Sequence, residues 1–97
     1  MYVVILGCGR VGATMANSLE ERGHQVAVID QNPDAFRRLG PTFEGRTVTG
    51  IGFDPDVLRQ AGIEQADAFA AVSSGDNSNI IASRVAREEF GVDTVAA

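Results

Sequence analysis

The sequence predicts an α/β domain with a doubly wound parallel sheet, strand order 3-2-1-4-5 and helices on both faces. Five apolar or β-branched segments alternate with four helical patterns along the 97 residues. A glycine-rich turn from Gly7 to Gly12 follows the first of these segments, and an acidic residue, Asp30, ends the second. Because connections are short and parallel crossovers are right-handed, few other arrangements fit this alternation. The expected architecture is therefore Rossmann-like.

The strands are expected where apolar or β-branched residues run together between turn residues. The segment from Ala68 to Val72 is a nearly continuous apolar run, as expected of a strand covered on both faces. The expected strands cover residues 2–6, 25–29, 46–50, 68–72 and 93–97.

The helices are expected from apolar spacing and from capping residues. Val11, Met15 and Leu19 recur at the spacing of one helix face. Asn32 and Asp54 each precede a proline, the pattern of an N-cap followed by Pro at the first helical position. The expected helices cover residues 11–21, 33–39, 55–61 and 80–90.

The glycine turn has the G-x-G-x-x-G spacing of a dinucleotide site. In such a site Gly7 makes the tight turn, Gly9 lets the backbone approach a pyrophosphate, and Gly12 lets the helix pack closely. Asp30 follows at about the 20-residue spacing of the acid that binds the ribose hydroxyls. An acid there repels a 2′-phosphate, so NADP is disfavoured. The alternatives are an empty structural turn and a purely structural Asp30.

Three arginines and the cysteine need separate interpretations. Arg10 lies in the turn and could add bidentate bonds to the phosphates, the alternative being a surface arginine. Arg37 and Arg38 are expected to solvate the short helix. Cys8 is expected to be a small filler residue rather than a redox sensor.

At this strand order the loops after strands 1 and 4 face each other across one crevice. The second of these loops holds small polar residues that either cap the next helix or line the crevice, namely Ser73, Ser74, Asp76 and Asn77. No His, Cys, Lys or Tyr accompanies them, so no acid–base or nucleophile constellation is recognisable. His24 and Tyr2 are expected at the opposite end of the sheet. We expect no catalytic residue.

Composition excludes several functions. The formal net charge of −5 argues against a nonspecific nucleic-acid binder. The chain has no lysine, which excludes Schiff-base chemistry and a Walker-type phosphate lysine. No Cys/His cluster offers a metal site. We find no leader and no apolar run of about 20 residues, so we expect a cytoplasmic protein without membrane insertion.

Besides the glycine turn and the Asp30 segment, three further stretches stand out. They are the loop from Gly50 to Leu58, Gly62-Ile63-Glu64-Gln65-Ala66-Asp67-Ala68 and Asp76-Asn77-Ser78-Asn79. Together these motifs resemble the RCK (TrkA-N) domains of bacterial potassium uptake systems and potassium channels. The glycine turn and the Asp30 segment are shared with dehydrogenases, whereas the last two stretches single out this family.

The resemblance implies a regulatory domain that binds NAD(H) or an adenine nucleotide, ATP or ADP. It implies a subunit at the inner face of the plasma membrane that controls a potassium transporter or channel. The helix after Asp76 carries Ile80 and Ile81 with Val85 and Phe90, from which we expect a homo-oligomer. Residues 1–97 form one domain, expected to be cut from a longer chain.

One position departs from the family pattern. Ile51 stands where many members have an aspartate that contacts the adenine, although Ile51 could still pack on the adenine face. The other functions left open are the cofactor-binding half of an NAD-dependent dehydrogenase and a structural assembly module. The expected nucleotide-binding residues are Gly7, Cys8, Gly9, Arg10, Val11, Gly12, Asp30, Gln31, Ile51, Ser73, Ser74, Asp76 and Asn77.

Overall fold

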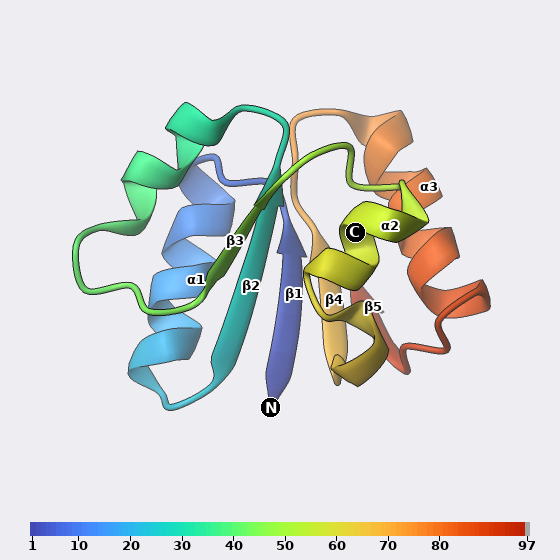
Figure 1. Ribbon diagram of the computed structural model, residues 1–97, viewed down its shortest axis with the longest axis horizontal. Coiled ribbons are helices and arrows are strands. Elements are labelled where there is room, and N and C mark those ends of the chain that lie inside the picture. The colour runs from blue at the N-terminus through green and yellow to red at the C-terminus, as the bar shows by residue number, and fades with distance from the viewer. Residues whose placement is uncertain (97) are drawn as a thin grey trace.

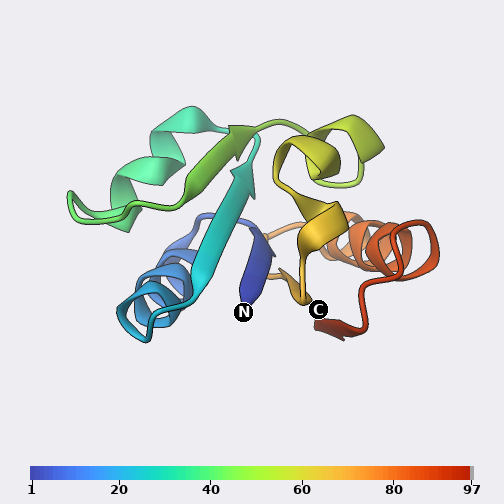
Figure 2. The same ribbon diagram turned by 60° about the horizontal axis from the view of Figure 1, so that its bottom comes forward.

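The computed structural model describes residues 1–96 and contains one five-stranded sheet in the order β3-β2-β1-β4-β5 (Figure 1). All four strand pairs are parallel, so the predicted topology is confirmed. The strands are β1 Tyr2–Leu6, β2 Gln25–Asp30, β3 Arg46–Thr49, β4 Ala68–Ala71 and β5 Thr94–Ala96. Figure 2 shows β3 and β5 at opposite edges of the sheet. Ala97, the last residue of the expected fifth strand, lies outside the described residues.

The helices differ from expectation mainly at their ends. They are α1 Arg10–Glu21, η1 Pro33–Leu39, α2 Pro55–Gln60, η2 Ile63–Gln65 and α3 Asp76–Glu88, of which η1 and η2 are 3₁₀ helices. α3 begins four residues before Ile80, because its first turn is polar and carries no apolar signal. η2 was not expected; it begins after Gly62, whose left-handed φ of 84° reverses the chain.

Helices cover both faces of the sheet (Figure 1). Successive side chains of a strand point to opposite faces, and β1 shows this alternation directly. Val3 and Ile5 pack with residues of α1 and η1 on one face, whereas Val4 and Leu6 pack with residues of α2, η2 and α3 on the other. β1 is therefore buried from both sides, with Ile5 fully inaccessible.

The sheet direction decides where the loops meet. All strands run the same way, so the loops after β1, β2 and β4 gather at their carboxyl ends, at the top of Figure 1. α1 and α3 begin at this same edge. Among residues 1–96, no helix is long and apolar enough to cross a membrane.

Candidate functional site

A crevice of about 630 Å³ lies at the carboxyl ends of the strands. This volume is within the range of about 300–1,000 Å³ typical of small-molecule pockets. Its lining comes from the loops after β1, β2, β3 and β4 and from η1 and the first turns of α1 and α3. The lining residues are Leu6, Gly7, Cys8, Gly9, Arg10, Val11, Asp30, Gln31, Asn32, Ala35, Arg38, Gly52, Val72, Ser73, Ser74, Gly75 and Ser78.

The three glycines of the turn meet different surroundings. Gly7 has a φ of +109°, and a Cβ there would lie 2.7 Å from the backbone of Ser73, so the two loops are in contact across the crevice. A Cβ on Gly12 would overlap the carbonyl oxygen of Gly7, so no side chain fits where α1 meets the turn. A Cβ on Gly9 would meet no atom within 4 Å. Gly9 thus leaves open space beside its backbone.

The N-terminus of α1 opens into the crevice without a cap. Its N-cap is Gly9, and no side chain caps the N–H groups of its first turn. An α-helix leaves its first N–H groups without partners inside the helix, and its dipole makes this end positive. The short helices η1 and α2 are capped instead, by Asn32 and Asp54. The free donors at α1 are a suitable place for a phosphate.

α3 also begins at the crevice, from Gly75, with no side-chain cap. The preceding loop is held by Ser73 and Asn79: the Ser73 hydroxyl donates to Asn79 Oδ1 at 2.5 Å, and Asn79 Nδ2 donates to the Ser73 carbonyl at 2.9 Å. Ser73 and Ser74 line the crevice, but Asp76 and Asn77 do not. These two belong to the exposed side of the first turn of α3, one turn earlier than the apolar pattern placed that helix.

Asp30 ends β2 and connects two loops. Its Oδ2 accepts a hydrogen bond from the Cys8 N–H at 2.8 Å, and its Oδ1 accepts one from the Asn32 N–H at 2.9 Å. Asp30 therefore has the structural role that we considered as the alternative to ribose binding, because it joins the loops after β1 and β2. Each carboxylate oxygen still has a second lone pair. Asp30 is only partly buried, so it can also accept bonds from a ligand's hydroxyl groups.

Cys8 is fully buried beneath the turn. Burial raises the pKa of its thiol, the nearby Asp30 carboxylate raises this pKa further, and Arg38 partly opposes the shift. Since the thiolate is the reactive form, a thiol with a raised pKa is a poor nucleophile. The geometry agrees with a filler residue.

Arg38 corrects one of our expectations, because it lines the crevice instead of only solvating the short helix. Its Nη1 donates to the Cys8 carbonyl oxygen at 3.5 Å. In a 3₁₀ helix, residues three apart lie on the same side, so Arg38 lies on the same side of η1 as the crevice-lining Ala35. Arg37 is exposed and does not line the crevice. The sequence alone does not distinguish Arg38 from Arg37, because it does not specify that this short helix has three residues per turn.

Three further residues complete the comparison with expectation. Gln31 lines the crevice. Gly12 does not line it, but packs against the backbone of Gly7. Ile51 also lies outside the lining, with 44% of its surface exposed. Gly52 was not expected. It lines the crevice, and a Cβ there would overlap the Leu6 side chain. A glycine at this position lets the loop after β3 lie against β1.

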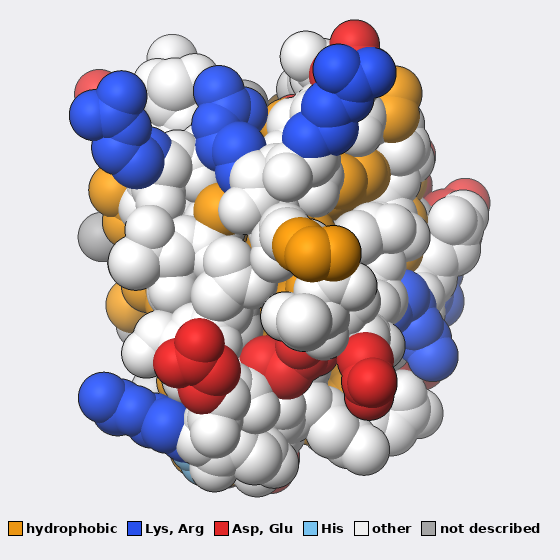
Figure 3. Space-filling view, turned by 90° about the vertical axis from the view of Figure 1, so that its left-hand side faces the viewer, with side chains coloured by type: hydrophobic (Ala, Val, Ile, Leu, Met, Phe, Trp, Pro, Cys, Tyr) orange, Lys and Arg blue, Asp and Glu red, His pale blue; other side chains and the backbone are white. Residues whose placement is uncertain are grey.

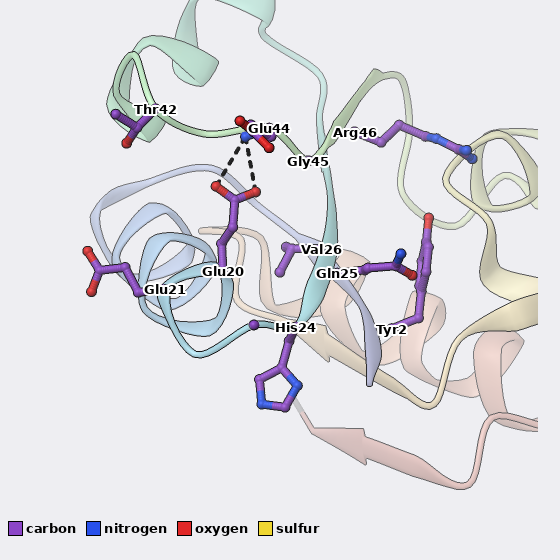
Figure 4. Close-up of a pocket in the computed structure, with 11 residues that line it drawn as sticks. Tyr2, Glu20, Glu21, His24, Gln25, Val26, Thr42, Glu44, Gly45 and Arg46 are labelled. Atoms are coloured by element: carbon purple, nitrogen blue, oxygen red, sulfur yellow. Dashed lines mark hydrogen bonds between the residues drawn. The ribbon is translucent and has the colours of Figure 1, made fainter.

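A second hollow of about 980 Å³ lies at the opposite edge, near the starts of β1, β2 and β3 (Figure 4). Glu20, Glu21, Glu44 and His24 are among its lining residues. The Glu20 carboxylate accepts the Glu44 N–H at 3.0 and 3.1 Å. Within residues 1–96 no group of three or more His, Cys, Asp or Glu side chains could hold a metal ion.

Charge is divided between the two edges. On the face shown in Figure 3, several arginine side chains lie along the top, where the strands end, and acidic side chains are more prominent toward the bottom, although each kind also occurs at the other end. The charged residues that line the crevice are Arg10, Arg38 and Asp30, so positive charge is in excess there. Those that line the other hollow are Glu20, Glu21, Glu44 and Arg46, so negative charge is in excess there. An anion is therefore favoured at the crevice edge, even though the formal net charge of the chain is −5.

Comparisons with known proteins place these features in a family. The family model described as the TrkA-N domain matches residues 3–97. The chain is 71% identical over 97 residues to the Trk system potassium uptake protein TrkA of Streptomyces coelicolor, covering all of this chain and 44% of that protein. It is 40% identical over 87 residues to a TrkA homolog of Pyrococcus abyssi, covering 90% of this chain and 38% of that protein. The chain thus spans less than half the length of these relatives.

Solved structures show the same fold. The AMP-bound form of the Shewanella denitrificans Kef CTD superposes with a TM-score of 0.78 at 21% identity, covering 99% of this chain and 58% of that one. The GsuK RCK domain superposes with a TM-score of 0.77 at 26% identity, covering 98% of this chain and 20% of that one.

Proposed function

The chain belongs to the TrkA-N family, and from this we propose that it is the nucleotide-binding part of a regulatory protein for a membrane potassium transporter or channel. The family relatives are named as potassium uptake proteins. A crevice that can hold a ligand supports a regulatory role, because ligand binding can favour one arrangement of domains or subunits over another.

The ligand we propose is NAD(H) or an adenine nucleotide, ATP or ADP. The observation that carries this proposal is the uncapped N-terminus of α1, with open space at Gly9 and with Asp30 on the same wall. The diphosphate would lie over Gly9, Arg10 and Val11, and the ribose hydroxyls would reach Asp30. NAD⁺, NADH, ATP and ADP all share this adenosine diphosphate part, so the geometry supports the whole class of ligands and does not distinguish its members.

The nucleotide acts here as a signal and is not transformed. Hydride transfer needs a positioned proton donor or acceptor, and phosphate hydrolysis needs cationic stabilisation and an oriented water. The crevice offers Arg10, Arg38 and Asp30 as its charged groups, and no His, Lys or Tyr is among its lining residues. Binding would instead favour one arrangement of domains or subunits, by a coupling of about 1–3 kcal/mol.

The protein would work as a homo-oligomer at the cytoplasmic face of the membrane. Ile80 and Ile81 on α3 are 56% and 45% exposed. Val85 and Phe90, which we expected to join this surface, pack partly against the core. The contact surface on α3 is therefore narrower than the sequence suggested.

The test uses the natural full-length protein that carries this chain. It is incubated with NADH, ATP or ADP, the ligand is followed by chromatography, and potassium flux is measured in vesicles that hold the partner transporter. We expect nucleotide-dependent flux with full recovery of the ligand. Sustained turnover of the ligand, or a potassium flux that is the same with and without each nucleotide, would contradict the proposal.

A further inference from the structure

Two side chains of opposite charge, Asp30 and Arg38, form hydrogen bonds with the backbone of Cys8 in the glycine turn. Asp30 Oδ2 accepts the Cys8 N–H at 2.8 Å, and Arg38 Nη1 donates to the Cys8 carbonyl oxygen at 3.5 Å. Across the described residues, the one salt bridge is between Arg59 and Asp56, so Asp30 and Arg38 do not pair with each other. Both nevertheless line the crevice. A ligand at this wall meets a carboxylate and a guanidinium that have not neutralised one another.

The Asp30 carboxylate and the Arg38 guanidinium differ in how many of their hydrogen-bonding positions are already used within the protein. Both oxygens of Asp30 hold a backbone N–H at short distance. Arg38 makes a single hydrogen bond, at 3.5 Å, which is long for a hydrogen bond. A guanidinium has five N–H donors in a planar fork. Most of the donors of Arg38, whose side chain is exposed, therefore remain available to a ligand.

In Rossmann-type sites an acid after strand 2 binds the ribose 2′-hydroxyl, whereas an arginine nearby accommodates a 2′-phosphate. This chain carries both groups on one wall. We infer that Arg38 is a specificity-determining residue, which sets how strongly the crevice discriminates between a nucleotide with a free 2′-hydroxyl and one with a 2′-phosphate. The inference rests on the proposed function. Asp30 repels the additional phosphate, and Arg38 reduces that penalty through charge-assisted bonds.

The adjacent Arg37 provides a matched control. It belongs to the same 3₁₀ helix η1, it is exposed, and it does not line the crevice. Replacing either arginine by glutamine removes one positive charge from nearly the same place. An effect seen only at Arg38 therefore comes from contact with the ligand, because a long-range field would be changed by both substitutions.

The experiment measures dissociation constants by titration calorimetry for NADH and NADPH, and for AMP and adenosine 2′,5′-bisphosphate. The full-length natural protein is compared with Arg38→Gln, Arg38→Lys and Arg37→Gln. The quantity of interest is the affinity ratio within each ligand pair. We expect Arg38→Gln to shift this ratio about tenfold against the 2′-phosphorylated ligand. Arg38→Lys should shift it less, and Arg37→Gln should leave it unchanged.

The outcomes separate the inference from the proposed function. If the 2′-hydroxyl ligands bind but the ratio is the same in every variant, or shifts equally in Arg37→Gln, the inference is wrong and the nucleotide site stands. If no ligand of either pair binds the unchanged protein, and ATP and ADP also fail to bind, the proposed function fails and the inference fails with it. Thermal melting verifies that each variant is folded. If Arg38→Gln does not fold, Arg38→Lys still tests the inference.

Discussion

The hollow at the start of the strands is larger than the crevice at their ends, about 980 Å³ against about 630 Å³. Several polar groups around the larger hollow already have partners. The Glu20 carboxylate accepts the Glu44 N–H (Figure 4). The Tyr2 hydroxyl donates to the Ala61 carbonyl at 2.6 Å, and Arg46 donates to the Gln60 carbonyl at 2.9 Å. In the crevice, by contrast, the first turn of α1 has no side-chain cap and Gly9 leaves open space.

Parallel topology explains this difference. Strand ends and helix N-termini meet at one edge, so positive dipole ends gather there. At the other edge α1 ends, and Glu20 and Glu21 of its last turn line the larger hollow. We therefore propose the crevice as the ligand site because of its unused donors, although the other hollow is larger.

The glycine turn should tolerate a side chain least at Gly12. A Cβ there would overlap the Gly7 carbonyl oxygen, which is backbone and cannot move aside easily. We expect Gly12→Ala to lower the free energy of unfolding by about 3 kcal/mol, measured by urea denaturation. The control is Gly23→Ala at the opposite edge, where φ is +89° and no atom lies within 4 Å of the Cβ position. Its cost should be about 1–2 kcal/mol; equal losses would contradict the close packing at Gly12.

The two carboxylates that hold backbone N–H groups should behave differently. Asp30 holds two such groups and lines the crevice, whereas Asp67 holds the Tyr2 N–H at 2.8 Å, where β1 begins. We expect Asp30→Asn to cost about 2 kcal/mol of unfolding free energy and to weaken NADH binding. Asp67→Asn should cost about 1 kcal/mol and leave the affinity unchanged. Calorimetry on both variants checks this, and a loss of affinity in Asp67→Asn would count against the crevice.

A substitution at Gly9 should affect nucleotide binding without affecting the stability of the fold. Its φ of −80° suits any residue, and nothing lies within 4 Å of its Cβ position. Gly9→Ala should therefore leave the melting temperature unchanged but lower nucleotide affinity about tenfold, or ~1.4 kcal/mol, because the new methyl group occupies the space of the phosphates. Glu21→Gln, in the larger hollow, should change neither quantity. If Gly9→Ala binds the nucleotide with undiminished affinity, the phosphates do not lie at Gly9.

The smallest effect is expected from the thiol beneath the crevice. Burial and Asp30 raise the pKa of Cys8 above the ordinary 9.0. The folded state therefore favours the protonated thiol. This contribution to stability is complete below the pKa of the unfolded thiol and is lost as pH rises through the folded-state pKa. We expect urea denaturation to show a decline in stability above about pH 9 that Cys8→Ala reduces. The same decline in both proteins would assign it to other groups.

The fold was predictable because its signals are local. The alternation of strands and helices, the capping residues Asn32 and Asp54, and the glycine turn each occupy a few consecutive residues, and the structure has the predicted strand order. What the sequence did not reveal depends on backbone geometry. The helical turn η2 follows a left-handed Gly62, and α3 begins in a polar turn without an apolar residue to mark it.

The candidate site was predictable in part for the same reason. Residues inside the glycine motif and at the end of β2 line the crevice as their spacing suggested. Arg38 was missed because its direction depends on η1 having three residues per turn, which the sequence of a short helix does not specify. Asp76 was placed in the crevice because the start of α3 was not recognised. Ile51 and Gly52 are adjacent, yet only Gly52 lines the crevice.

We propose that the crevice at the carboxyl ends of the strands holds the nucleotide and that the larger hollow does not. Amide chemical shifts of the isotopically labelled protein, followed during titration with NADH and with ADP, distinguish the two places. We predict shifts in the turn from Gly7 to Val11, in Asp30 to Asn32 and in Ser73 to Ser78, with Glu20 to His24 and Glu44 to Arg46 unchanged. Shifts confined to the second set, or no saturable shift with either ligand, would contradict the account.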